Sequence, residues 1–468
     1  MTLLSILLYL IPILLGIFVV HLIWNTDDQK IFLLKLALGI GVGIGLTSFL
    51  YFVSLLTHPS VFLFLLLGFL VLLGFQAVRG WKPLPFLQGA PLTRLQKLLL
   101  LILAFVVLVD LATFISTSLR RPHGAWDSWA IWNRAARFIY RGGEEWQRVF
   151  SEEFNWLFHA DYPLLVPLTN TWVWDILNFE TLRAPMIQSG IYLFGSGLLL
   201  FSALFVFRSI GTASLATIVL MALPAFVGIG TSQIADTPLA MFIAATAILF
   251  CLYSKYQQPQ MMALAGITTA LAAWTKNEGM IFLISSLIGL LVISYKDRQA
   301  WQLRSWYAGG IVLPLLIVLF FRFRLAPPGD LFGSNWVEIL HRTTDFSRYA
   351  ITLKAFLALF FNLRGWGYGL GYSAPSFLLY YLVWRRRGTV IWSRGLLAVL
   401  VMLMIQLLAY FASYIITPHD LEWHLAFSLD RILLHLYPMA LFVLFSVTED
   451  PENIFLSKQL PVHGIATK

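Results

Sequence analysis

The side chains best suited to chemistry lie in the stretch from residue 119 to residue 167. It is the first long polar interruption of an apolar sequence and reads LRRPHGAWDSWAIWNRAARFIYRGGEEWQRVFSEEFNWLFHADYPLLVP. At 100° per residue, Asp127 shares one helix face with Arg134, Arg137 and Arg141, while the opposite face is apolar. This pattern predicts an amphipathic helix at a membrane surface, where a carboxylate and several cations could meet an anion. A helix N-cap is the alternative role for Asp127.

Two more acidic residues follow at points where polar sequence gives way to apolar sequence. Asp161 lies between His159 and Tyr162, and both His159 and Asp161 are candidates for acid–base or metal chemistry. A turn is the alternative interpretation of this segment, because Asp and Pro are common turn formers. Asp236 precedes Thr237-Pro238, so it could cap the next helix and still face a site.

Cations also occur at predicted membrane boundaries. Lys276 and Glu278 lie between two apolar runs with no room for a long loop, where ionisable groups are costly and usually paired. Either they form an ion pair, or Lys276 binds a phosphate. Arg431 follows Asp430 and is predicted to anchor a phosphate or carboxylate. Asp110, inside an apolar run, raises the same expectation more weakly.

The composition is that of a membrane protein. Of 468 residues, 59% are hydrophobic and 12% charged, which excludes an ordinary soluble domain. The net charge of +9 arises mostly from residues that flank apolar segments, so it indicates contact with lipid headgroups and no nucleic-acid partner. A lone cysteine, Cys251, excludes a disulfide framework.

The chain is predicted to be all-α, with about thirteen membrane spans. Positive loops place the N-terminus outside and the C-terminus in the cytoplasm, and they leave the candidate residues together on the extracytoplasmic face. Residues 164–178 and 350–363 are expected to form interfacial helices. The predicted spans are residues 2–23, 32–57, 60–78, 98–117, 186–207, 213–229, 236–254, 260–275, 279–295, 305–321, 367–384, 395–416 and 432–447.

The order of the motifs resembles the GT-C superfamily of membrane glycosyltransferases, which use polyprenyl-phosphate-linked sugars. It is most similar to the protein O-mannosyltransferase and lipid A aminoarabinose transferase branches. Asp127 resembles the acidic residue early in the first loop of that family, and Thr275-Lys276 its Thr-Lys-Gly turn. Three longer motifs are also similar: Gly142-Gly143-Glu144-Glu145-Trp146, Tyr162-Pro163-Leu164-Leu165 and Asp236-Thr237-Pro238-Leu239.

The resemblance covers roughly residues 98–447, and it departs from the family pattern at three places. Trp126 precedes Asp127 where the family usually has a second acid, and Tyr162 replaces one proline of a pair. Residues 1–97 add three spans that the simplest members lack. The expected organisation is an N-terminal region (1–97), a catalytic domain (98–447) with its loop at 118–167, and a cytoplasmic tail (448–468).

The resemblance implies transfer of a sugar from a polyprenyl-phosphate donor to a lipid, glycan or protein acceptor, with inversion. Asp127 is the expected base, assisted by Asp161 or Asp236. Lys276 and Arg431, helped by Arg134 or Arg137, are expected to bind the phosphate.

The expected location is a bacterial inner membrane, with the active site outside. No cofactor is predicted firmly, and assistance by a divalent metal ion is left open. The alternative function is a transporter or flippase of lipid-linked saccharides, because ionisable residues inside a membrane also mark substrate pathways.

Overall fold

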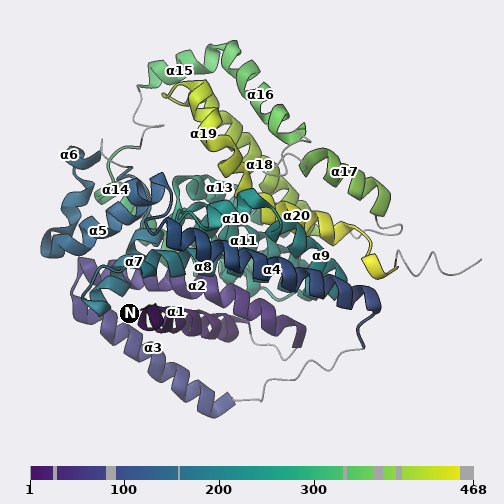
Figure 1. Ribbon diagram of the computed structural model, residues 1–468, viewed down its shortest axis with the longest axis horizontal. Helices are drawn as coiled ribbons and strands as arrows, with labels where there is room; N and C mark the ends of the chain where they lie inside the picture. The colour runs from purple at the N-terminus through teal and green to yellow at the C-terminus, as the bar shows by residue number, and fades with distance from the viewer. Residues whose placement is uncertain are drawn as a thin grey trace, which may run out of the picture.

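The computed structural model describes residues 2–24, 29–80, 91–155, 159–329, 335–361, 373–385 and 393–453, and its fold is all-α, as predicted (Figure 1). Apart from one isolated bridge, Arg385 to Thr448, every regular element in these ranges is helical. Up to residue 207, the helices are α1 (Thr2–Ile23), α2 (Gln29–Leu56), α3 (Pro59–Gly80), α4 (Arg94–Arg120), η1 (Ser128–Trp132), α5 (Asn133–Gly142), η2 (Gly143–Phe150), α6 (Glu152–Asn155), α7 (Leu165–Leu177) and α8 (Arg183–Phe207).

The second half continues the same pattern of long apolar helices joined by short loops. Its helices are α9 (Ile210–Met221), α10 (Pro224–Gly230), α11 (Asp236–Tyr256), α12 (Met261–Thr275), α13 (Asn277–Ser294), α14 (Ala300–Arg324), α15 (Trp336–Thr344), α16 (Phe346–Phe361), α17 (Ser373–Trp384), α18 (Arg394–Ile416), α19 (Leu421–Leu434) and α20 (Tyr437–Val447).

Within the described residues, 8 helices are long and apolar enough to cross a membrane, or up to 10 if two bent pairs each count as one span. The bent pairs are α9 with α10, at 71°, and α19 with α20, at 44°. The chain is therefore an integral membrane protein. Not all of the thirteen predicted spans correspond to helices that are long enough to cross a membrane. The predicted span 260–275 corresponds to α12, which has 15 residues, and the first part of the predicted span 367–384 lies outside the described residues.

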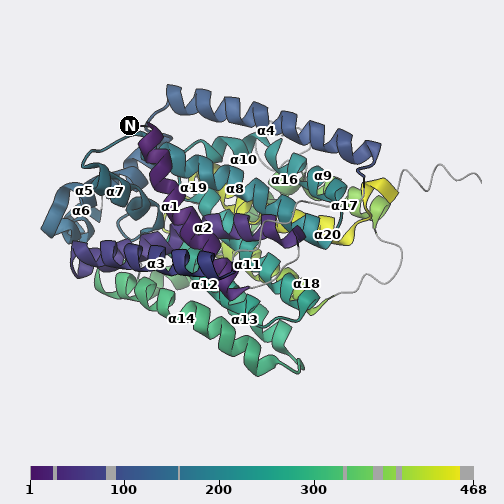
Figure 2. The same ribbon diagram turned by 90° about the horizontal axis from the view of Figure 1, so that it is seen from below.

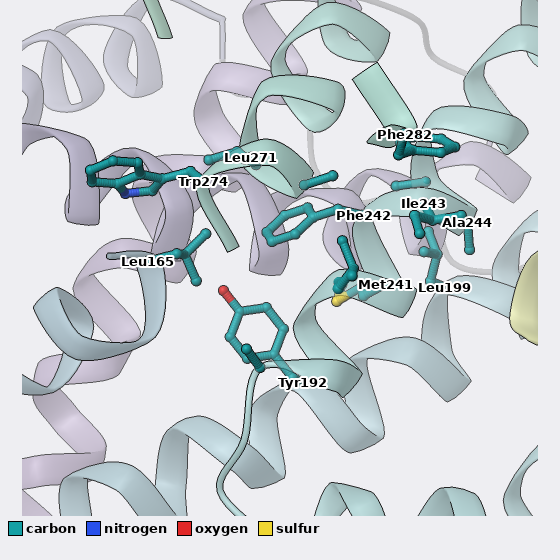
Figure 3. Packing of buried hydrophobic residues seen from close by; sticks show 14 of the residues in the cluster. Leu165, Tyr192, Leu199, Met241, Phe242, Ile243, Ala244, Leu271, Trp274 and Phe282 are labelled. Atoms are coloured by element: carbon teal, nitrogen blue, oxygen red, sulfur yellow. The ribbon is translucent and has the colours of Figure 1, made fainter. Parts of the chain in front are cut away.

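Helix α11 forms the centre of the bundle, and 94% of its most apolar 18-residue stretch is buried. It contacts α8, α12, α18 and α20, and the side chains of Phe242 and Ile243 lie in the packed interior (Figure 3). A helix that is apolar on every side is stable only when neighbours surround it. The packing of α11 therefore fixes the position of Asp236 at its first residue.

Several glycines allow helices to approach closely, and two of them show how. A Cβ at Gly43 would lie 1.8 Å from the carbonyl oxygen of Pro12, so only glycine lets α1 and α2 approach this closely. A Cβ at Gly279 would lie 1.8 Å from the carbonyl oxygen of Ala272. The turn between α12 and α13 is consequently tight, and Lys276 lies in it.

The two ends of α11 carry different groups. Asp236 begins the helix, whereas Lys255 in its last turn donates a hydrogen bond to the carbonyl oxygen of Val206. Near that last turn, Arg208 Nη2 lies 3.3 Å from Asp450 Oδ1. At 1.5 Å per residue, Asp236 and Lys255 are about 30 Å apart along α11, roughly the thickness of a bilayer core. The basic loops predicted to be cytoplasmic thus lie opposite the acidic candidates.

The predicted interfacial helix at 164–178 corresponds to α7, which is enclosed by the protein. Its residues 165–174 are buried, and it packs against α2, α5 and α8. The buried Asn170 amide donates to Asn133 Oδ1 at 3.2 Å, and the Thr171 hydroxyl donates to the Ala136 carbonyl at 3.2 Å. These bonds satisfy the polar groups of α7 inside the protein and attach it to α5.

The second predicted interfacial helix, at 350–363, corresponds to α16, which contacts α18 and α19 at the edge of the molecule (Figure 1). Figure 2 shows α4 along one border of the molecule and α14 along the other. Most of the α4 surface is exposed, since only 11% of its most apolar 18-residue stretch is buried.

Candidate active site

Four segments far apart in the sequence meet in one cluster of charged side chains. Arg431 Nη1 lies 2.6 Å from Asp127 Oδ2, and Arg431 Nη2 lies 3.2 Å from Asp236 Oδ2. Lys276 Nζ lies 3.3 Å from Asp236 Oδ1 and 2.9 Å from Glu278 Oε1. Five of the residues predicted from the sequence thus belong to one hydrogen-bonded group, which we call the ion cluster.

Asp236 is the buried centre of the ion cluster. Its side chain is 1% exposed, and its carboxylate accepts hydrogen bonds from Arg431, Lys276 and His435. Asp236 is not the N-cap considered from the sequence, because Ala235 occupies that position and Asp236 is the first residue of α11. Because the Asp236 carboxylate is buried and accepts hydrogen bonds from Arg431 and Lys276, it holds these two cations side by side.

A second layer of hydrogen bonds supports Asp236. His435 Nε2 lies 2.9 Å from Asp236 Oδ1, and His435 Nδ1 lies 3.2 Å from the Tyr410 hydroxyl. With Nε2–H donating to the carboxylate, Nδ1 accepts from Tyr410. Both side chains are fully buried. His435 lies at the bend between α19 and α20, one helical turn after Arg431, so the two residues reach Asp236 from the same face.

Lys276 is held between two carboxylates. Burial alone would lower the pKa of Lys276, but the carboxylates of Asp236 and Glu278 outweigh this effect and leave the pKa raised. Lys276 therefore remains a cation despite being 6% exposed. The ion pair considered from the sequence does form, and it places a permanent positive charge beside Arg431.

Asp161 is the centre of a neighbouring group. Its Oδ2 accepts a hydrogen bond from Asn277 at 2.6 Å, and Arg322 Nη1 lies 3.2 Å from its backbone carbonyl oxygen and 3.7 Å from Oδ2. His159 Nδ1 lies 3.9 Å from Oδ1. Asn277 follows Lys276 directly, so this second group adjoins the ion cluster.

Tyr162 lies between the two groups. Its ring stacks on Trp132 on one side, at 5.2 Å between centroids, and on His159 on the other, at 4.8 Å. Burial, followed by the carboxylates of Glu278 and Asp161, raises the pKa of Tyr162 well above its ordinary value. The phenol thus remains protonated and able to donate a hydrogen bond. The stacking holds the Tyr162 ring in one orientation next to the ion cluster.

A π-helical turn explains why Asp127 points toward Arg431. Residues Ser128–Trp132 form this turn, η1, and the regular helix α5 begins only at Asn133. A π turn has a wider period than 3.6 residues, so it rotates the preceding residue away from the face expected at 100° per residue. The predicted face shared by Asp127 and the three arginines is therefore wrong. The side chain of Asp127 also makes no cap hydrogen bond.

Of the three arginines on α5, two contact Glu180. Arg137 Nε lies 3.6 Å from Glu180 Oε2 and stacks over Trp174, and Arg141 Nε lies 2.5 Å from Glu180 Oε1. The structure thus brings together Lys276 and Arg431, and it directs Arg137 elsewhere.

Replacing Arg137 with Gln is expected to leave the turnover rate within about twofold of the parent, because its partner is a partly exposed surface carboxylate. The rate should be measured on purified protein with a lipid-linked sugar donor. A loss of tenfold or more would instead show that Arg137 does act on the phosphate.

No group of three or more His, Cys, Asp or Glu side chains in the described part of the chain has the arrangement of a metal site. In the ion cluster, each carboxylate that a divalent ion would require is already paired with Lys276 or Arg431. The described residues therefore give the metal alternative no support.

The sequence interpretation missed the supporting residues Tyr410, His435, Asn277 and Arg322. His435 could have been found, because it lies four residues after Arg431 in a predicted helix and thus shares its face. Tyr410 and Arg322 lie in long apolar helices and become partners only through tertiary packing. No local pattern distinguishes them from residues at the membrane interface.

No protein-family model and no curated protein matches this sequence. Among solved structures, the chain is similar to the crystal structure of ArnT from Cupriavidus metallidurans in the apo state, with 15% sequence identity and a TM-score of 0.42. The match covers 72% of this chain, which spans 58% of the ArnT chain.

Proposed function

We propose that the protein is a membrane glycosyltransferase that moves a sugar from a polyprenyl-phosphate donor to an extracytoplasmic acceptor, with inversion. The observation that supports this most is the convergence of Asp127, Arg431 and Lys276 in a single cluster. A transfer of this kind needs a base for the acceptor and cations for the departing phosphate, and the ion cluster offers both. The motif order that resembles GT-C enzymes supports the same reaction.

Arg431 is the proposed anchor of the donor phosphate. Its Nε is buried and has no hydrogen-bond partner, whereas both of its terminal nitrogens are engaged. A buried donor without a partner costs free energy until a ligand satisfies it. An incoming phosphate would satisfy Nε and compete with Asp127 for Nη1. Lys276 would supply the second positive charge.

Asp127 is the proposed base, because its side chain is 25% exposed whereas that of Asp236 is 1% exposed. When the phosphate takes its place on Arg431, the Asp127 carboxylate becomes free to accept a proton. It would remove the proton from the acceptor nucleophile, which attacks the anomeric carbon. The bond from that carbon to the phosphate oxygen breaks, and the polyprenyl phosphate leaves with both electrons.

Three carboxylates, those of Asp127, Asp236 and Glu278, face two cations in the ion cluster. The cluster thus carries one excess negative charge with His435 neutral. A phosphate can be accommodated only if a carboxylate moves away or is neutralised. This balance links donor binding to the release of Asp127 in the proposed reaction.

Replacing Lys276 with Gln is expected to raise the dissociation constant for the donor about tenfold or more and to lower the rate, because one charge-assisted contact to the phosphate is lost. Binding of a polyprenyl-phosphate sugar should be measured by calorimetry on protein that remains monodisperse. Lys296→Gln, in a loop at the other end of the bundle, is the matched control. Unchanged donor affinity in Lys276→Gln would remove Lys276 from the phosphate site.

The function itself is tested by incubating the purified protein with a mixture of polyprenyl-phosphate sugars and a membrane extract as the acceptor source. Release of free polyprenyl phosphate is the expected result. Movement of intact lipid-linked saccharide across a vesicle membrane, without such release, would instead favour a transporter or flippase.

A further inference from the structure

Glu278 belongs to the ion cluster, and the proposed reaction gives it no step. Its Oε1 lies 2.9 Å from Lys276 Nζ, whereas its Oε2 is buried and has no hydrogen-bond partner among the residues that the structure describes. Lys276 already has a second carboxylate partner in Asp236. A buried acceptor without a hydrogen-bond donor is costly, so Glu278 is suited to a donor group that a ligand brings.

A buried amide holds the backbone of Glu278 in place. Gln406 Nε2 donates to the Glu278 carbonyl oxygen at 3.1 Å, and the Ser285 hydroxyl donates to Gln406 Oε1 at 3.0 Å. Gln406 is fully buried in α18, and Glu278 is the second residue of α13. Two packed helices thus fix the position of this carboxylate, which is the support that a group in contact with a substrate requires.

Glu278 and Asp127 lie at the two ends of the ion cluster. The charges form a chain in the order Asp127, Arg431, Asp236, Lys276 and Glu278. The side chains at the two ends are 25% and 17% exposed, whereas the central carboxylate is 1% exposed. A phosphate held by the two cations therefore has one partly exposed carboxylate on either side.

The Glu278 carboxylate also lies near the loop that carries Asp161 and Tyr162. After burial, it is the group that raises the pKa of the Tyr162 phenol the most. Stacking on Trp132 holds this phenol beside the ion cluster. Glu278 thus lies at the same polar end of the bundle as the proposed base.

We propose that Glu278 determines which sugar is transferred, by accepting a hydrogen bond from the sugar hydroxyl on the carbon next to the anomeric carbon. Only two carbon atoms separate this hydroxyl from the phosphate oxygen, so a phosphate bound to Lys276 brings the hydroxyl to the neighbouring carboxylate. The class of sugar donor that follows is a hexose or pentose with a free hydroxyl at this position. This role rests on the proposed transferase function.

The contact is strongest when the bond to the phosphate breaks. Positive charge then develops at the anomeric carbon and makes the adjacent hydroxyl a better hydrogen-bond donor. Glu278 takes up no proton in this step, because the proton of the acceptor goes to Asp127. A sugar that lacks the hydroxyl leaves the carboxylate without its hydrogen bond, and such a sugar is therefore rejected.

The experiment uses a panel of polyprenyl-phosphate hexoses and pentoses, each paired with its counterpart that lacks this hydroxyl. The purified full-length protein receives one sugar donor at a time with a membrane extract as the acceptor source. The value of kcat/KM is measured from the release of polyprenyl phosphate. The parent is compared with Glu278→Gln, which keeps the shape of the side chain, and with Glu278→Ala. Lys276→Gln is the matched control, because it changes the other member of the same ion pair.

The quantity compared is the ratio of kcat/KM between the two sugar donors of a pair, with the hydroxylated donor in the numerator. This ratio is expected to fall about tenfold in Glu278→Gln and further in Glu278→Ala, since a charge-assisted hydrogen bond is first weakened and then lost. Differences in intrinsic reactivity between the two sugars cancel when parent and variant are compared. In Lys276→Gln both sugar donors should lose rate together, so the ratio should stay within about twofold of the parent.

An unchanged ratio in Glu278→Gln and Glu278→Ala would overturn the proposal, because Glu278 would then only hold Lys276. A fall of the same size in Lys276→Gln would also overturn it, since the preference would come from the position of the phosphate. If Glu278→Ala does not remain monodisperse, Glu278→Gln alone decides. If the parent releases no polyprenyl phosphate from any sugar donor, the proposed function fails, and the role of Glu278 fails with it.

Discussion

Replacing Asp127 with Asn is expected to lower the turnover rate by about 10²- to 10⁴-fold, the usual contribution of a general base. The amide has nearly the same shape and can still hydrogen-bond to Arg431, but it cannot accept a proton. Donor binding should not weaken, because Arg431 loses a charged competitor for the phosphate. The rate is measured as release of polyprenyl phosphate at saturating donor, alongside donor affinity.

The matched control for this substitution is Glu145→Gln, which removes an exposed carboxylate from the same loop. Glu145 Oε2 pairs with Arg148 Nη1 at 2.8 Å, so both variants lose a carboxylate–arginine contact. Only the Asp127 variant should lose turnover. If it transfers sugar at the parental rate while folding normally, another residue is the base.

Replacing Asp236 with Asn is expected to reduce the free energy of unfolding by about 3–5 kcal/mol, the usual cost of removing one partner of a buried ion pair. Asp236 is the shared acceptor for Arg431, Lys276 and His435. Without its charge, the two cations retain only their outer partners, Asp127 and Glu278. Unfolding can be followed by helical circular dichroism in detergent against denaturant concentration.

The matched control is Glu180→Gln, since Glu180 also serves two cations but lies at the surface, where its side chain is 22% exposed. Its removal should cost about 0–1 kcal/mol. A loss of stability in the Asp236 variant no greater than in this control would show that the ion cluster does not stabilise the fold.

The sequence predicted the ionisable members of the site better than their arrangement. Asp127, Lys276 and Arg431 were identified because charges at the boundaries of apolar runs are costly and are retained there for a reason. The positive loops also indicated that these charges lie at one end of the bundle. The π turn was not predicted, because hydrophobic periodicity assumes a regular helix. Because of this turn, Asp127 pairs with Arg431 and not, as the sequence had predicted, with the arginines of α5.

The fold class could be predicted from composition, whereas the number of spans could not. The predicted span 213–229 is a bent helix pair, α9 with α10, broken at Ala222-Leu223 before Pro224. The predicted span 432–447 begins in the last residues of α19 and continues as α20 after a bend at His435-Leu436, next to Pro438. A proline near the start of a helix is tolerated at a bend as well as in a loop, so hydropathy cannot distinguish a continuous span from a broken one. The burial of α7 likewise depends on contacts with α2 and α5, which no local pattern contains.

The most direct measurement is a cryo-electron-microscopy map of the protein with polyprenyl phosphate bound. The phosphate is expected within hydrogen-bonding distance of Arg431 Nε and Lys276 Nζ, with the Asp127 side chain displaced from Arg431 and facing the acceptor side. A phosphate bound at the end of the bundle that carries Arg208 and Lys255 would contradict the proposed site. The same conclusion would follow if Asp127 lay more than about two helical turns from the phosphate.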